Sequence, residues 1–119
     1  MSSGQRLRSA KRRFGAAEML TDEGFEADAM SRIYFGVLEA ARALLALEDA
    51  DPKTHKGVAM KLGEHFRHDV DTGLLTKLRQ QREEVDYNLR RPSRETVEDF
   101  LERAEELVQQ AEAIITETG

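Results

Sequence analysis

The sequence contains no cysteine, no tryptophan and only two prolines among its 119 residues. Without cysteine there is no disulfide framework, no thiolate metal site and no cysteine nucleophile, a usage typical of a reducing compartment. A run of about 18 apolar residues, which a membrane-spanning helix needs, does not occur. No hydrophobic run follows the first basic residues as it does in a secretory signal. We therefore expect a soluble protein of the cytoplasm that does not enter a membrane.

Motifs for phosphate loops, dinucleotide binding and nucleophilic serines are also missing, which excludes most nucleotide-hydrolysing and acyl-transfer enzymes. The three histidines, His55, His65 and His68, do not have the spacing of a metal site. We therefore expect no metal and no other cofactor. His55 lies in a turn before a predicted helix, where we expect it to cap that helix, or alternatively to contact an anion.

Apolar residues recur every three or four positions along almost the whole chain, which is typical of amphipathic helices. The spacing predicts a helix over roughly 5–22 and a second helix from Phe25 to Leu47, whose wide apolar arc indicates a central position. Three further helices are expected: a short one after Thr54, a fourth with the apolar stripe Leu75, Leu78, Val85 and Leu89, and a fifth after Ser93.

Cap residues mark where these last three helices begin. Thr54 and Ser93 are predicted caps of the third and fifth helices, and the stretch 69–72 offers caps for the fourth. No segment alternates in the strand period. We predict one all-α domain over residues 1–119, with its core over about 5–117, built as an up-and-down four-helix bundle with an additional short helix.

The net charge of −5 is unevenly distributed along the chain. The segments 1–20, 21–52, 53–91 and 92–119 carry +4, −6, +3 and −6. Folding could gather the two basic segments on one side of the molecule. The simpler expectation is that neighbouring opposite charges pair.

Arg82 is the most informative single residue, because it falls on the apolar stripe of the fourth helix. An arginine in this position must be paired, must extend its charged end to water, or must line a cleft or an interface. Asp86 follows one helical turn later, so the simplest expectation is an Arg82–Asp86 ion pair.

The second helix carries a large aromatic residue, Phe35, among the charged residues of its less apolar face, next to Arg32. Such a position often marks an interface. Tyr34 falls on the apolar side, and we expect it in the core with its hydroxyl satisfied at the edge.

Three segments together resemble a known family. Ser31-Arg32-Ile33-Tyr34-Phe35, followed by an alanine-rich helix, resembles the Ser-Arg-x-Tyr-Tyr segment of small stand-alone HEPN-domain proteins of prokaryotes. The stretch 52–58 resembles the turn that enters the third helix of these proteins. The stretch 82–87, Arg-Glu-Glu-Val-Asp-Tyr, resembles their Arg-x-x-x-Asp-Tyr segment. The resemblance covers roughly residues 10–115 in the expected order.

The resemblance implies a helical bundle that commonly forms a homodimer, and a toxin–antitoxin pairing with an MNT-type nucleotidyltransferase. Active members of the family are metal-independent ribonucleases with an Arg-x4–6-His motif at the dimer cleft. Arg82 corresponds to the arginine of that motif, and Tyr87 takes the place of the histidine. Some members carry AMP on a tyrosine two positions further on, where this chain has Leu89, so Tyr87 is the alternative acceptor.

Three hypotheses follow. The first is a HEPN module that binds a nucleotidyltransferase through Phe35 and Arg32, and RNA or a nucleotide through Arg79, Arg82 and Arg32. The second is a ribonuclease toxin that uses Arg82, Asp86 and Tyr87 in a dimer cleft. Metal-free cleavage needs a base and a cation, and the cation is the role that Arg82 suits. The third is a plain helical interaction module.

Overall fold

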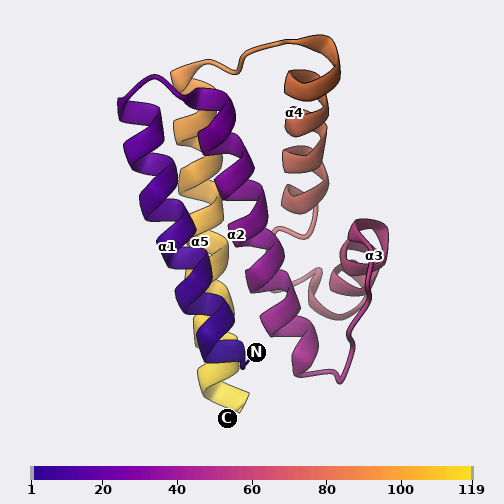
Figure 1. Cartoon of the computed structure of the whole chain (residues 1–119). Helices are drawn as coiled ribbons and strands as arrows, with labels where there is room; N and C mark the ends of the chain where they lie inside the picture. The colour runs from indigo at the N-terminus through magenta and orange to yellow at the C-terminus, as the bar shows by residue number, and fades with distance from the viewer. Residues whose placement is uncertain (1, 119) are drawn as a thin grey trace.

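A computed structural model describes residues 2–118, which form five α-helices and no strand (Figure 1). The helices are α1 (Ser3–Asp22), α2 (Glu26–Ala46), α3 (His55–Phe66), α4 (Leu74–Asn88) and α5 (Arg94–Thr118). The predicted all-α class is therefore confirmed. No helix in residues 2–118 is long and apolar enough to cross a membrane.

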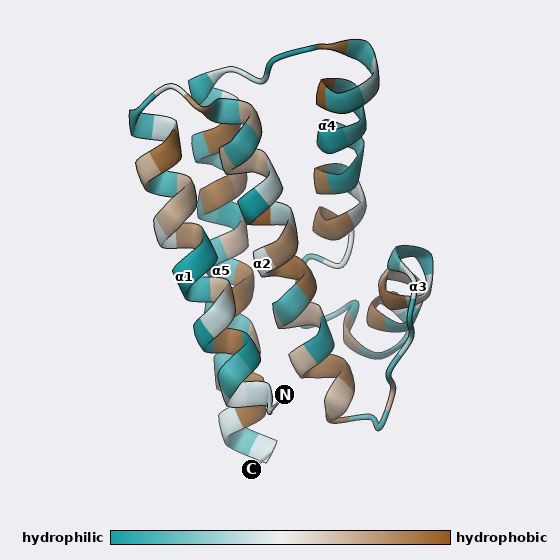
Figure 2. Cartoon of the chain, in the orientation of Figure 1, coloured by the Kyte–Doolittle hydropathy of each residue, from teal (hydrophilic) through white to brown (hydrophobic). Residues whose placement is uncertain are grey.

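The chain runs up α1, down α2, up α4 and down α5, with the short α3 beside the lower end of α2 (Figure 1). Helix α2 packs against each of the other four helices, as its wide apolar arc predicted. Helices α1, α2 and α5 form a three-helix unit, and α4 lies against the opposite side of α2. The wide hydrophilic faces of α1 and α4 are visible in Figure 2.

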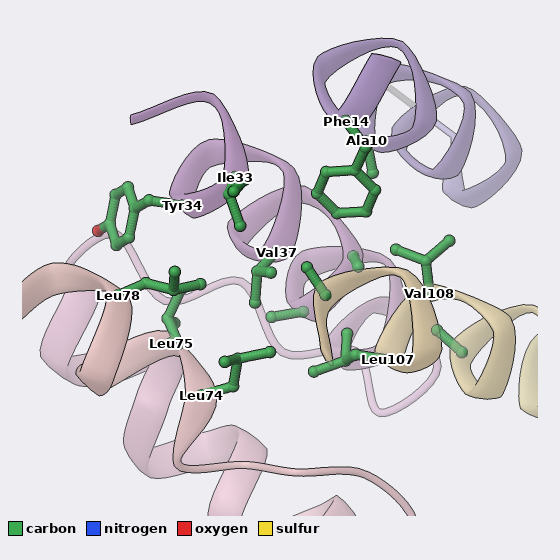
Figure 3. Packing of buried hydrophobic residues seen from close by; sticks show 14 of the residues in the cluster. Ala10, Phe14, Ile33, Tyr34, Val37, Leu74, Leu75, Leu78, Leu107 and Val108 are labelled. Atoms are coloured by element: carbon green, nitrogen blue, oxygen red, sulfur yellow. The ribbon is translucent and has the colours of Figure 1, made fainter. Parts of the chain in front are cut away.

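The hydrophobic core lies around α2 and receives apolar side chains from every helix. Figure 3 shows Phe14 of α1, Val37 of α2 and Leu107 of α5 meeting in it. Helix α4 contributes three fully buried leucines from its first turns, Leu74, Leu75 and Leu78.

Helices α1 and α2 approach closely where Gly36 meets Phe14. A Cβ atom at Gly36 would overlap the buried Phe14 ring. Glycine is therefore required here by space rather than by backbone conformation.

Two of the predicted helix caps are confirmed. The Thr54 hydroxyl accepts a hydrogen bond from the Gly57 N–H at 3.0 Å, and the Ser93 hydroxyl accepts one from the Thr96 N–H at 3.1 Å. The prediction that residues 69–72 cap α4 is wrong, because the cap position is Gly73, which makes no side-chain bond to the helix. Asp71 instead accepts from the Gly73 N–H at 3.2 Å and binds Arg103 of α5 at 2.9 Å.

The predicted apolar stripe of α4 is wrong at its end. The helix stops at Asn88, and Leu89 adopts a left-handed conformation with φ of 53° and is 88% exposed. The left-handed residue turns the chain away from the helical path, so Leu89 leaves the stripe that Leu75 and Leu78 begin. The second half of α4 therefore extends beyond the core.

Candidate functional site

Arg82 is half-buried in the space between α4 and α2, where it packs on two aromatic rings. Its guanidinium carbon lies 4.8 Å from the ring centre of Tyr34 and 4.9 Å from that of Phe35. The two rings meet edge to face, with centres 5.1 Å apart. A flat cation is attracted by aromatic faces, and its methylene stem is compatible with apolar neighbours. This packing explains why an arginine occupies a position on an apolar stripe.

The expected Arg82–Asp86 ion pair does not form. No salt bridge involves either residue among residues 2–118, and Asp86 is exposed. Residues four apart in a helix can pair only if both side chains turn to the same side, and here the Arg82 side chain lies over α2. The Arg82 charge therefore has no acidic partner within this part of the chain.

Tyr34 and His55 complete the inner side of this cluster. Tyr34 is buried, as predicted, and its hydroxyl lies 2.9 Å from Nδ1 of His55. The two rings stack with centres 5.7 Å apart, and Figure 3 shows Tyr34 at the margin of the core beside Leu78. His55 does not cap α3, because Thr54 holds that position. The His55 ring instead contacts Tyr34 of α2.

Burial and nearby cations set the ionisation of this pair. Burial raises the pKa of Tyr34 above its ordinary value, against the opposing effect of Arg82 and two other arginines. Burial, helped by the positive charge of Arg79, lowers the pKa of His55, and Glu83 opposes this shift. A protonated Tyr34 and a neutral His55 are thus favoured, and the imidazole tautomer sets which of the hydroxyl and Nδ1 donates the hydrogen bond.

The remaining predicted site residues fall into two groups. Arg79 lies beside the cluster, close enough to affect the pKa of Tyr34, and pairs with Glu83 at 3.4 Å. Phe35 is 36% exposed, and the guanidinium carbon of Arg13 lies 5.6 Å from its ring centre.

Arg32, Asp86 and Tyr87 are the second group, and all three are exposed. Arg32 lies on α2 beside α1. Asp86 and Tyr87 lie in the last turn of α4. The structure therefore groups Arg79, Arg82 and Phe35, and leaves these three outside the cluster.

Sequence reasoning missed the contributions of His55 and Arg13 to this cluster. His55 is 21 residues from Tyr34 in the sequence, and Arg13 reaches Phe35 from another helix. Contacts between helices have no signature in local spacing. The only available signal was the charge of +4 carried by residues 1–20, to which Arg13 contributes.

Comparison with known families gives the assignment. Residues 4–114 match the family model of the HEPN domain. The chain belongs to the HEPN family. A Methanocaldococcus jannaschii protein named "Putative toxin MJ0605" is 27% identical over 113 residues, which cover 91% of this chain and 84% of that protein. "UPF0332 protein PH1297" of Pyrococcus horikoshii is 32% identical over 72 residues, 60% of this chain and 49% of that protein.

In this HEPN domain, the cluster around Arg82 provides a fixed cation, with a buried tyrosine and its half-buried histidine partner behind it. No group of three or more His, Asp or Glu side chains within residues 2–118 is placed to hold a metal ion. The Arg82 guanidinium of this cluster can attract an anion, and the Tyr34–His55 pair can exchange a proton.

Proposed function

We propose that this HEPN domain is one member of a toxin–antitoxin pair, that it binds an MNT-type nucleotidyltransferase, and that Arg82 contacts RNA or a nucleotide. The observation that carries the proposal is the placement of Arg82 on Tyr34 and Phe35 without an acidic partner. The family membership and a relative named as a toxin support the pairing.

Arg82 suits a phosphate because its position is fixed while its charge stays uncompensated. Two rings restrict the guanidinium, so little side-chain entropy is lost when an anion binds. The planar group offers two parallel N–H donors to phosphate oxygens. Arg79, one turn earlier, adds positive charge to the same region, although Glu83 neutralises part of it.

Tyr87 is the proposed acceptor of AMP from the partner enzyme. The chain has two tyrosines. Tyr34 is 5% exposed with its hydroxyl bonded to His55, whereas Tyr87 is 81% exposed. In the transfer, the Tyr87 oxygen bonds to the α-phosphorus of ATP, pyrophosphate leaves, and the phenolic proton passes to a base of the partner or to water. Accessibility thus selects Tyr87.

Co-expression with an MNT-type nucleotidyltransferase tests the pairing, and the enzyme to use is one encoded beside this chain's own gene. We expect the two proteins to elute together in size exclusion, and we expect Arg32→Glu to weaken the complex. Arg67→Glu reverses the charge of another exposed arginine, at the end of α3, and is the matched control. Separate elution of the wild-type proteins would contradict the pairing and favour a plain interaction module.

Mass spectrometry of the same co-expressed protein tests the acceptor. We expect an AMP adduct on the peptide containing Tyr87, and no adduct in Tyr87→Phe. An adduct elsewhere, or none in the wild type with an active partner, would remove the proposed role of Tyr87.

A second candidate function is a metal-independent ribonuclease in a dimer cleft, which is favoured by the exposure of Asp86 and Tyr87 one turn beyond Arg82. If this is correct, Arg82→Gln should abolish RNA cleavage by the purified protein, and Arg82→Lys should restore part of it because a cation remains. Equal RNA decay with wild type and Arg82→Gln would eliminate this candidate.

A further inference from the structure

A second basic feature lies outside the Arg82 cluster, in a groove between α1 and α2. The groove has a volume of about 640 Å³. Four arginines line it, three from α1 and one from α2: Arg8, Arg12, Arg13 and Arg32. We call this surface the arginine groove.

The arginines of this groove differ from the other basic residues of α1. Arg6 pairs with Glu39 at 3.3 Å and Lys11 pairs with Glu112 at 2.7 Å. None of the four groove arginines has an acidic partner within 4.0 Å among residues 2–118, as the pairs formed there show. Like charges gathered without counterions repel one another, and a bound anion relieves that repulsion.

Arg13 joins this groove to the Arg82 cluster. Its guanidinium carbon lies 5.6 Å from the ring centre of Phe35, and Arg82 approaches the same ring at 4.9 Å. Nε of Arg13 is buried without a hydrogen-bond partner in the described structure, so the stacking on Phe35 positions this side chain. Phe35 thus connects two arginines from two helices, and the positive surface continues from α1 to α4.

The lining of the groove indicates the chemical class of its ligand. Apart from the arginines, it consists of Gln5, Ser9 and Ala16. The centre of a protein interface combines arginine with aromatic anchors in well-packed, desolvated pockets, and this lining offers arginines without an aromatic or large apolar side chain. Guanidinium groups match phosphate oxygens, and several in a row match a chain of phosphates. A positively charged groove leading to an exposed aromatic ring is typical of single-stranded nucleic-acid binding.

We propose that the arginine groove binds the phosphate backbone of single-stranded RNA and leads the strand across Phe35 to Arg82. This inference rests on the proposed contact between Arg82 and RNA. It adds a binding surface on α1 that is separate from the residues of α4. The groove should bind RNA through its charge and without preference for base sequence, because contacts to phosphates do not distinguish bases.

The test compares two double variants of the full chain that remove the same charge from the same helix. Arg8→Gln with Arg12→Gln removes two groove arginines, and Arg6→Gln with Lys11→Gln removes two paired bases. Binding of fluorescein-labelled oligouridine is measured by anisotropy over a range of salt concentrations. All four positions are on α1, and circular dichroism of each variant checks that the helices are retained.

We expect the groove variant to bind about tenfold more weakly at low salt, and its salt slope to fall by about 1.4, at about 0.7 per lost contact with a single strand. The paired-base variant should change affinity by less than about twofold, because its charges are already neutralised. Equal weakening by both variants would show an effect of net charge alone and would contradict RNA binding by the groove arginines. A wild-type protein that does not bind oligouridine would also contradict the proposal.

Two further measurements separate this proposal from its alternatives. ATP added as a competitor should displace little of the bound oligouridine. Efficient displacement would identify a free nucleotide as the ligand and would contradict the proposal that the groove binds single-stranded RNA. Co-elution with the nucleotidyltransferase should be unaffected in the groove variant, because that variant retains Arg32, the groove residue expected to contact the partner. Loss of that complex with RNA binding intact would make the groove a protein interface. Failure of the wild-type complex with the groove effect intact would overturn the proposed pairing alone.

Discussion

Helix α1 separates two grooves of opposite charge. On its α2 side is the arginine groove, whereas on its α5 side two adjoining hollows share Glu18 and Glu105. We call this second surface the acidic groove. Its further acidic residues are Asp22, Glu98, Glu102 and Glu112. Some acidic residues of the acidic groove form ion pairs, such as Asp22 with Arg94 at 2.8 Å. The four arginines of the arginine groove form none among residues 2–118. A chain with a net charge of −5 thus carries one surface lined by four arginines that have no acidic partner among residues 2–118.

The two sides of α1 also differ in packing. On the α2 side, Gly36 admits the Phe14 ring so closely that no Cβ atom fits. On the α5 side, Gly15 lines the acidic groove, and a Cβ added there would meet no atom within 4 Å beyond its chain neighbours and its own helix backbone. Helix α1 is thus closely packed against α2 at Gly36 and has free space at Gly15.

The largest expected effect on stability comes from adding a methyl group at Gly36, where α1 and α2 pack closely. Gly36→Ala forces an added methyl group against the buried Phe14 ring, and overpacking of this kind typically costs about 1–3 kcal/mol. We expect the free energy of unfolding to fall by about 2 kcal/mol, despite the better helix propensity of alanine. Urea unfolding followed by circular dichroism measures it. Unchanged stability would mean that α1 and α2 shift apart easily.

A smaller effect is expected from the hydroxyl of Tyr34. Tyr34→Phe leaves Nδ1 of His55 without its hydrogen bond, and the loss of such a bond costs about 1 kcal/mol. Tyr87→Phe is the matched control, because Tyr87 is 81% exposed and we expect no change in stability. Equal stability of the two variants in urea would contradict a structural role for the Tyr34–His55 contact.

Adding a methyl group at Gly15, where there is free space, should change stability in the opposite direction. Gly15→Ala places a methyl group in free space on a helix, and we expect stability to rise by about 0.5–1 kcal/mol. Gly63→Ala in α3 also meets no atom within 4 Å and should behave alike. A loss of stability in Gly15→Ala alone would show that the acidic groove is occupied or closes in solution.

The smallest expected effect is the pH dependence of stability that arises from His55. Because the pKa of His55 is lowered in the folded protein, the unfolded chain binds more protons between that pKa and about 6.5. Stability should therefore fall as the pH drops below about 6.5. The groups that face His55 are Tyr34, Arg79 and Glu83. His55→Gln should flatten this part of the curve, and an unchanged slope would contradict the shift.

Much of the fold could be predicted from the sequence because helix formation depends on local spacing. The period of the apolar residues located all five helices, and the caps Thr54 and Ser93 were found from residue type. Leu89 was misplaced because a left-handed residue follows no period. The stretch 69–72 was wrongly expected to cap α4, because the cap position is Gly73. Asp71 accepts from the Gly73 N–H with one carboxylate oxygen and binds Arg103, 32 residues away, with the other.

The candidate site was predicted only in part. Periodicity singled out Arg82 on an apolar stripe and Phe35 on a charged helix face, but it did not reveal that the Arg82 guanidinium packs on the Phe35 ring. The local ion pair with Asp86 was the simplest expectation, yet the aromatic surface of α2 attracts the guanidinium instead. Whether Arg82 pairs with Asp86 one turn away or packs on α2 depends on how the helices pack, which local spacing does not determine.

The sequence by itself determined that this protein is a helical bundle with α2 at its centre, since those properties follow from apolar periodicity. Only the tertiary structure decided which charges remain unpaired. Arg6 and Arg8 are two residues apart on one helix, yet Arg6 meets Glu39 and Arg8 opens into a groove. Residues two apart point to different sides of a helix, so the neighbouring helices determine their partners.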